Sequence, residues 1–201
     1  MHARVARFES GDQSMTDELI GKVRERVDSG EPPPGAQGML MLLDRDAGTS
    51  AGITFFENEQ AIKDAEPAFE AMGASMPEEL RGKRVSVEAY EVLFIDGEPG
   101  KAARVSSLQG SPDNFDEAAK TTQEVLPTVR QMPGSTGVVS LADRASGRAL
   151  IVTLWENEEA MRAGEEQANQ LRKQAAEGSG GEVVSVERFE VAVARMPATV
   201  S

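Results

Sequence analysis

The sequence contains no cysteine and a single histidine, His2. Without cysteine there are no disulfides, zinc–thiolate sites, iron–sulfur clusters or thiol nucleophiles. One histidine next to the N-terminus argues against a Ser-His-Asp triad and against haem ligation by histidine. The acidic residues lack the spacing of a calcium loop, and no glycine-rich nucleotide motif is present. We therefore predict that the protein holds no metal and no cofactor.

Long apolar runs are also missing. No stretch approaches the roughly 20 apolar residues that cross a bilayer, and the N-terminal residues lack the apolar core of a signal peptide. The formal net charge of −13 argues against nucleic acid or an anionic membrane as a partner, because an acidic surface repels both. These features predict a cytoplasmic protein that binds neither nucleic acid nor membranes.

Aromatic residues make up only 4% of the 201 residues, yet two of them mark a stretch that occurs twice. An apolar run ends in Phe56 in the first copy and in Trp155 in the second, and Glu-Asn-Glu follows each time. Each copy reads as a strand that leads directly into a helix, with Asn58 and Asn157 as the N-caps.

The repetition extends well beyond this stretch. Residues 34–92 and 133–191 align without a gap at a shift of 99, and 21 of the 59 aligned positions are identical. Because the matches fall together at turns, helix caps and strands, coincidence does not explain them. We therefore predict two tandem repeats, residues 1–95 and residues 101–195.

Each repeat has the element order βαββαβ. Period-two and helical apolar patterns place the strands of the first repeat at residues 3–8, 38–43, 51–56 and 85–94. Ser14 or Thr16 is the expected cap of its first helix, and Pro67 is predicted to interrupt and kink its second helix. This order is the ferredoxin-like plan, in which two helices cover one face of a four-stranded antiparallel sheet. The predicted fold class is α+β.

The arrangement resembles the dimeric α+β barrel proteins, most closely the antibiotic-biosynthesis-monooxygenase-like (ABM) domains. The resemblance rests on the element order and on the two strand-to-helix stretches that contain Phe56 and Trp155. In that family two such units pair their sheets into a barrel, usually across a homodimer. Here the resemblance implies fused ferredoxin-like repeats that pair into an intramolecular α+β barrel, a monomer with an internal pseudo-dimer. It leaves open whether such barrels pair further.

The resemblance also indicates a pocket. In the family, the aromatic at the positions of Phe56 and Trp155 lines a space between sheet and helices where flat substrates or haem are held. Haem-degrading relatives carry a histidine on the following helix, where this chain has Glu66 and Glu165. These two carboxylates are candidate general bases. The alternative is that the aromatics are ordinary core residues and that the carboxylates face solvent.

Further polar candidates lie on the first and last strands of each repeat. Arg4 and Arg104 occupy matching positions, and we predict that they form cross-strand pairs with Glu88 and Glu187. Arg4 and Arg104 would then polarise a bound carbonyl or enolate; the alternatives are that they form structural pairs or are exposed. Tyr90 lies on the mixed face of the last strand and completes the set of pocket candidates.

Two functions fit these features. The first is a small-molecule-binding ABM-like barrel, without catalysis, that holds an apolar or aromatic molecule. The second is a cofactor-free monooxygenase or isomerase, in which the enolate of an aromatic or polyketide-like substrate reacts under the control of the protein. The sequence identifies no catalytic residue and no ligand. The differences between Trp155 and Phe56, and between Glu166 and Pro67, favour the second repeat as the working half.

Overall fold

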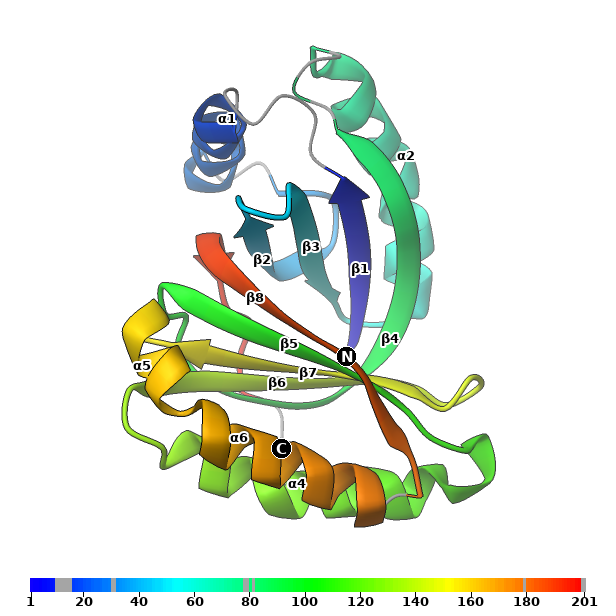
Figure 1. The fold of residues 1–201 in the computed structure, drawn as a ribbon. Coiled ribbons are helices and arrows are strands. Elements are labelled where there is room, and N and C mark those ends of the chain that lie inside the picture. Colours follow the sequence, from blue (N-terminus) through cyan, green and yellow to red (C-terminus); the bar gives the residue numbers. More distant parts are fainter. Residues whose placement is uncertain (10–15, 30–31, 78–79, 81, 179, 200–201) are drawn as a thin grey trace. The chain divides into compact units, whose positions relative to one another are not determined.

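The computed structural model describes residues 1–9, 16–29, 32–77, 80, 82–178 and 180–199. The first repeat contains β1 (His2–Glu9), α1 (Thr16–Asp28), β2 (Ala36–Asp44), β3 (Thr49–Phe56), α2 (Glu59–Ser75) and β4 (Lys83–Gly97) (Figure 1). The second contains β5 (Ala102–Gln109), the 3₁₀ turn η2 (Pro112–Asn114), α4 (Phe115–Arg130), β6 (Ser135–Asp143), β7 (Arg148–Trp155), α5 (Glu158–Ala163), α6 (Glu165–Gly178) and β8 (Glu182–Arg195). The predicted βαββαβ order is confirmed in both repeats.

The eight strands follow the hydrogen-bonded order β1-β3-β2-β8-β5-β7-β6-β4, which closes into an antiparallel barrel. The two repeats use the same register. The pairing of β1 with β3 places His2 opposite Phe56, and the pairing of β5 with β7 places Ala102 opposite Trp155. The protein is therefore an α+β barrel built from two ferredoxin-like repeats, as predicted.

The chain divides into two compact units whose boundaries fall inside the last strand of each repeat. The first unit holds Met1–Tyr90 with Val191–Pro197, and the second holds Glu91–Glu190 with Ala198–Ser201. β4 leaves the first unit at Tyr90, and its remaining residues pair with β6 in the second. β8 begins against β5 in the second unit and ends in the first. Each unit thus contains part of both last strands.

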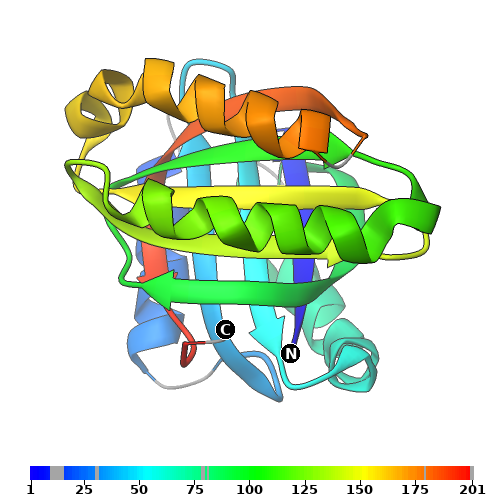
Figure 2. The same ribbon diagram turned by 90° about the horizontal axis from the view of Figure 1, so that it is seen from below.

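In the second unit, the helices form a closed layer. α4 and α6 run side by side over the sheet of β5, β7 and β6 (Figures 1 and 2). Beneath them Leu126 of α4 packs with Val138 and Ile151 of the sheet. Only a small pocket of about 40 Å³ remains between these two helices and the sheet.

In the first unit, α1 and α2 stand apart over the sheet of β1, β3 and β2 (Figures 1 and 2). Ile20 of α1 packs on Met41 and Leu43 of β2. α2 packs around Phe56, at the end of β3, through Ile62 and Ala65. The two helices therefore use different parts of the same sheet, and neither α1 nor α2 covers the strip of sheet between them.

The predicted N-caps are confirmed. The side-chain oxygen of Asn58 accepts a hydrogen bond from the backbone N–H of Ala61, and that of Asn157 accepts one from Ala160, both at 2.9 Å. Thr16 is the first residue of α1, whereas Ser14, the other expected cap, lies outside the described residues. Across the described residues, every helix is too short or too polar to span the apolar interior of a bilayer.

Pro67 does not interrupt its helix, so that prediction is wrong. α2 continues through Pro67 to Ser75, because the missing N–H removes one hydrogen bond while those of the neighbouring turns remain. The break occurs in the second repeat, where Gly164 separates α5 from α6. A Cβ atom at Gly164 would lie 2.8 Å from the Trp155 ring, so this backbone is pressed against the indole.

Candidate functional site

A cavity of about 900 Å³ lies in the first unit, between the sheet and helices α1 and α2. Side chains from β1, β2, β3 and both helices line it. The apolar part of its lining includes Phe8, Leu19, Val23, Met41, Phe69 and Met72. Charged side chains, among them Lys22, Arg26 and Arg84, also contribute. A volume in the range of about 300–1,000 Å³ and mostly apolar walls are typical of small-molecule sites.

Arg4 is the buried cation of this cavity. It lies on β1 and is only 4% exposed. Its Nε and Nη2 atoms donate to the two carboxylate oxygens of Glu66 on α2, at 2.9 and 3.0 Å. Its guanidinium carbon also lies 4.0 Å from the centre of the Phe69 ring. The bidentate ion pair with Glu66 and the contact with the Phe69 ring together fix the orientation of the guanidinium plane at the cavity wall.

The same contact determines the acid–base character of Glu66. The hydrogen bonds from Arg4 lower the pKa of Glu66, against a smaller opposing effect of burial, and the charges of Arg4 and Arg84 lower it further. A carboxylate with a lowered pKa, and with both oxygens already accepting hydrogen bonds, is a weak proton acceptor. This geometry disfavours Glu66 as a general base.

In the second unit, Trp155 is a core residue at the position that matches Phe56. The indole is fully buried and packs against Val129, Met132 and Met161. Its Nε1 donates to the Thr153 hydroxyl at 2.9 Å, so its polar group is satisfied. In the first unit the smaller Phe56 packs edge-on against Phe69 at a centroid distance of 6.3 Å. Trp155 thus occupies the position of a core aromatic.

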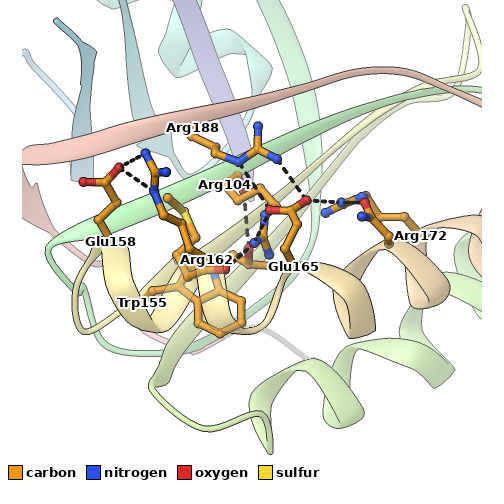
Figure 3. Close-up of polar contacts among 10 residues, drawn as sticks. Arg104, Trp155, Glu158, Arg162, Glu165, Arg172 and Arg188 are labelled. Carbon is orange, nitrogen blue, oxygen red and sulfur yellow. Dashed lines mark hydrogen bonds and ion pairs between the residues drawn. The ribbon is translucent and has the colours of Figure 1, made fainter. Parts of the chain in front are cut away.

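An arginine cluster surrounds Glu165 beside the indole (Figure 3). Arg104, Arg172 and Arg188 approach its carboxylate oxygens at 2.7, 3.0 and 3.0 Å. Arg104 is only 1% exposed. Its Nη2 atom also donates to the backbone carbonyl of Met161, whereas its Nε and Nη1 atoms are buried without a partner in the described structure. One carboxylate therefore compensates three cations, so the cluster carries excess positive charge.

The pKa shifts in this cluster reflect competing effects. Burial by itself would raise the pKa of Glu165, but the hydrogen bonds and charges of Arg188, Arg104 and Arg172 outweigh it and leave the pKa lowered. Burial lowers the pKa of Arg104, and the charge of Glu165 opposes that shift. Glu165 is therefore an ionised structural partner at neutral pH, and a poor general base for the same reason as Glu66.

The cross-strand pairs predicted for the two arginines are wrong. Arg4 and Arg104 pair with helix carboxylates, and not with Glu88 and Glu187. The register explains this for the second repeat. Arg104 lies opposite Arg188, whereas Glu187 lies opposite Val105, the residue that follows Arg104 on β5 and faces the other side of the sheet. Glu187 consequently points to the other side of the sheet.

Tyr90 belongs to neither cluster. It is buried on β4, and its hydroxyl donates to Glu88 at 2.9 Å. The six predicted site residues therefore lie in three places. Phe56 and Glu66 are in the first unit, and Arg104, Trp155 and Glu165 are in the second. Tyr90 lies on β4, where that strand leaves the first unit. The described lining of the cavity contains none of the six, although Arg4 links Glu66 to it.

Sequence reasoning missed the methionines of the cavity. Met39, Met41, Met72 and Met76 all line it, although a flexible thioether side chain in a sequence is by default interpreted as core filling. The alignment of the two repeats could have drawn attention to these four methionines, since none of them aligns with a methionine in the second repeat. In the part of the chain that the structure describes, no three His, Asp or Glu side chains gather as metal ligands.

The closed barrel of two ferredoxin-like repeats defines the class of protein, and solved structures of that class resemble the chain over nearly its whole length. A candidate monooxygenase from Fusobacterium nucleatum gives a TM-score of 0.71 at 14% identity, over 99% of this chain and 96% of that one. An anthrone oxidase-like protein gives 0.70 at 16% identity, over 96% and 92%. A ferredoxin-fold protein of Listeria monocytogenes related to antibiotic biosynthesis monooxygenases gives 0.51 at 9%, over 94% of both chains. The chain therefore has the ABM-like barrel fold.

The similarity to proteins of known sequence covers a smaller part of the chain. No protein-family model matches the chain. An uncharacterised protein of Mycobacterium tuberculosis strain H37Rv is 37% identical over 91 residues, which are 45% of this chain and 40% of that protein. The chain thus spans about two fifths of the length of this curated relative. At the identities of the solved structures, the likeness establishes the fold alone.

Proposed function

We propose that the protein is a small-molecule-binding ABM-like barrel whose ligand occupies the cavity of the first unit, and that it binds this ligand without transforming it. The observation that carries the proposal is the contrast between the units. One has about 900 Å³ between its sheet and helices. In the other, α4 and α6 are in contact, and the pocket at the matching positions, lined by Ser140, Ala142, Ala149 and Ala175, is only about 40 Å³. The expected ligand is a small apolar or aromatic molecule, because the walls are mostly apolar.

The polar groups around the cavity support binding over catalysis. Arg4 and Glu66 neutralise each other, and the lowered pKa of Glu66 makes it a poor base. Neither group is free to take a proton from a bound molecule. A fixed guanidinium at the wall can still orient a ligand through a carbonyl or hydroxyl oxygen.

One observation favours a second candidate, a cofactor-free monooxygenase. The solved structures of this fold include proteins described as a candidate monooxygenase and as anthrone oxidase-like, and the buried Arg4 would stabilise an enolate oxygen in the cavity. Oxygen uptake with anthrone as the probe separates the two functions. Faster uptake with the protein than without it, lost on Arg4→Gln, would replace the binding proposal with the oxygenase.

The binding proposal is tested by filling the cavity. Gly52 lines it from β3, and a Cβ atom there would meet no atom within 4 Å. The matching residue of the second repeat is Ile151, so Gly52→Ile introduces the side chain that the same strand position already accepts. We expect this variant to lose most of the fluorescence that the wild-type protein induces in the dye anilinonaphthalene sulfonate.

Gly21→Leu is the matched control. Gly21 is exposed on α1, a Cβ atom there also meets nothing within 4 Å, and the described lining does not include it. This variant adds the same side-chain volume outside the cavity, and dye binding should equal that of the wild type. Equal dye binding by Gly52→Ile and Gly21→Leu would refute the cavity as the binding site.

A further inference from the structure

Four of the nine methionines line the cavity of the first unit. Met39 and Met41 come from β2, Met72 comes from α2, and Met76 is the C-cap of that helix. They therefore lie on two opposing walls, the sheet and the helix. Met41 is 8% exposed, and the other three are half-buried. A small oxidant that enters the cavity can reach thioethers on both walls.

The second repeat serves as an internal comparison. At the alignment shift of 99, the four methionines correspond to Val138, Ser140, Leu171 and Ala175. The repeat whose helices close over the sheet thus carries no thioether at any of these positions. Strand and helix formation alone do not require methionine there, because the same elements form without it in the second unit.

We propose that Met39, Met41, Met72 and Met76 form an oxidation site, at which hydrogen peroxide converts the thioethers to sulfoxides and thereby weakens ligand binding in the cavity. The inference rests on the proposed function, because it concerns the affinity of the same cavity. It adds a modification and a regulation that the binding proposal does not require.

The chemistry needs no reagent beyond peroxide. The lone pair of the sulfur attacks one peroxide oxygen, an S–O bond forms, the O–O bond breaks, and the second oxygen leaves as water after proton transfer. Each sulfur loses two electrons and the peroxide is reduced by two. The product is methionine sulfoxide, in which a hydrogen-bond-accepting oxygen makes the formerly apolar side chain polar.

Oxidation would change the cavity in two ways. The sulfoxide oxygens would make a lining that includes Phe8, Leu19 and Phe69 more polar, so an apolar ligand would have to cover polar groups that it cannot hydrogen-bond. Met41 also packs with Ile20 of α1 and Leu43, so its oxidation would loosen the contact that holds α1 on the sheet. We expect about tenfold weaker ligand binding.

Two methionines of the second unit act as built-in controls. Met132 and Met161 are 4% and 1% exposed and pack against Trp155. Neither is among the described residues that line the cavity of the first unit, and both side chains are almost completely covered by other residues. Under peroxide at a concentration that leaves the protein folded, they should stay reduced while the cavity methionines are converted.

The experiment treats the full chain with hydrogen peroxide, locates sulfoxides by peptide mass spectrometry, and titrates anilinonaphthalene sulfonate before and after treatment. A variant with Met39→Leu, Met41→Leu, Met72→Leu and Met76→Leu keeps the apolar volume and cannot be oxidised at the site. We expect the wild type to lose dye affinity about tenfold and the variant to keep its affinity after the same treatment.

The outcomes separate the two proposals. Dye binding that is unchanged in the oxidised wild type overturns the oxidation site and leaves the binding cavity intact. Sulfoxides that form equally fast at Met132 and Met161, or an equal loss of affinity in the leucine variant, also overturn it. Failure of the untreated wild type to bind dye overturns the proposed function, and the oxidation site with it.

Discussion

The carboxylate of Glu165 offers the sharpest test of how the second unit is held together. Glu165→Gln keeps the side-chain shape but removes the charge that compensates Arg104, Arg172 and Arg188. Among the described residues, two nitrogens of the buried Arg104 already have no partner, so the variant leaves a desolvated cation with like charges beside it. Removing one partner of a buried ion pair costs about 3–5 kcal/mol.

We expect the lower end of that range for Glu165→Gln. The side chain of Glu165 is 27% exposed, and the amide oxygen of glutamine still accepts one hydrogen bond. A loss of about 3 kcal/mol corresponds to a decrease in Tm of about 6–12 °C for a chain of this size. Glu66→Gln in the first unit should cost about half as much, because Glu66 is more exposed and only Arg4 contacts it closely.

Urea denaturation measures the difference, and Trp155, the single tryptophan, reports on the second unit. The pKa of folded Glu165 is lowered, so its ionisation stabilises the protein fully above the unfolded pKa near 4.5. That contribution is lost as the pH falls through the folded pKa. The gap between wild type and Glu165→Gln should therefore be full at pH 7 and shrink below about pH 4.5. A gap under about 1 kcal/mol at pH 7, or one that does not change with acid, would refute the reasoning.

Two further predictions concern packing and helix caps. Gly164→Ala should destabilise the second unit by about 1–3 kcal/mol, because its Cβ meets the Trp155 ring at 2.8 Å. Adding Trp155→Phe should recover part of that loss, since the pair then matches the first repeat, and additive effects in a double-mutant cycle would contradict the contact. Asn58→Ala and Asn157→Ala should each cost about 1 kcal/mol in urea denaturation. Substitution of the exposed Glu57 by Ala is the control for both caps, and a cap effect no larger than the control would count against the capping role.

Local patterns in the sequence determined the elements and their duplication. The apolar run, the asparagine cap and the helical stripe that follows are interactions between residues close in the chain, so each can be read without knowing the fold. Repetition of all three at a shift of 99 predicted the ferredoxin-like repeats, and the strand order of the barrel agrees. Pro67 was misjudged because a helix held by packing on a sheet tolerates one missing hydrogen bond.

Partners that are distant in the chain could not be read in this way. Arg104 was predicted to pair with a residue of the neighbouring strand, and the pairing depends on a register that a shift of one residue reverses. The guanidinium reaches Glu165 on the helix layer. The sequence did place the right residue types in both repeats, an arginine on the first strand and a glutamate on the second helix, but it did not show that they meet.

The cavity was decided by tertiary structure alone. Both repeats follow the order βαββαβ, yet α4 and α6 pack together while α1 and α2 stand apart (Figure 1). The differences between the two repeats had favoured the second repeat as the ligand-binding half, in part because it carries the larger aromatic residue. In the fold, that large ring is buried in the core of the second unit, and the cavity lies in the first unit. Whether two helices close over a sheet depends on the summed volumes of side chains from five elements, and no local pattern contains that sum.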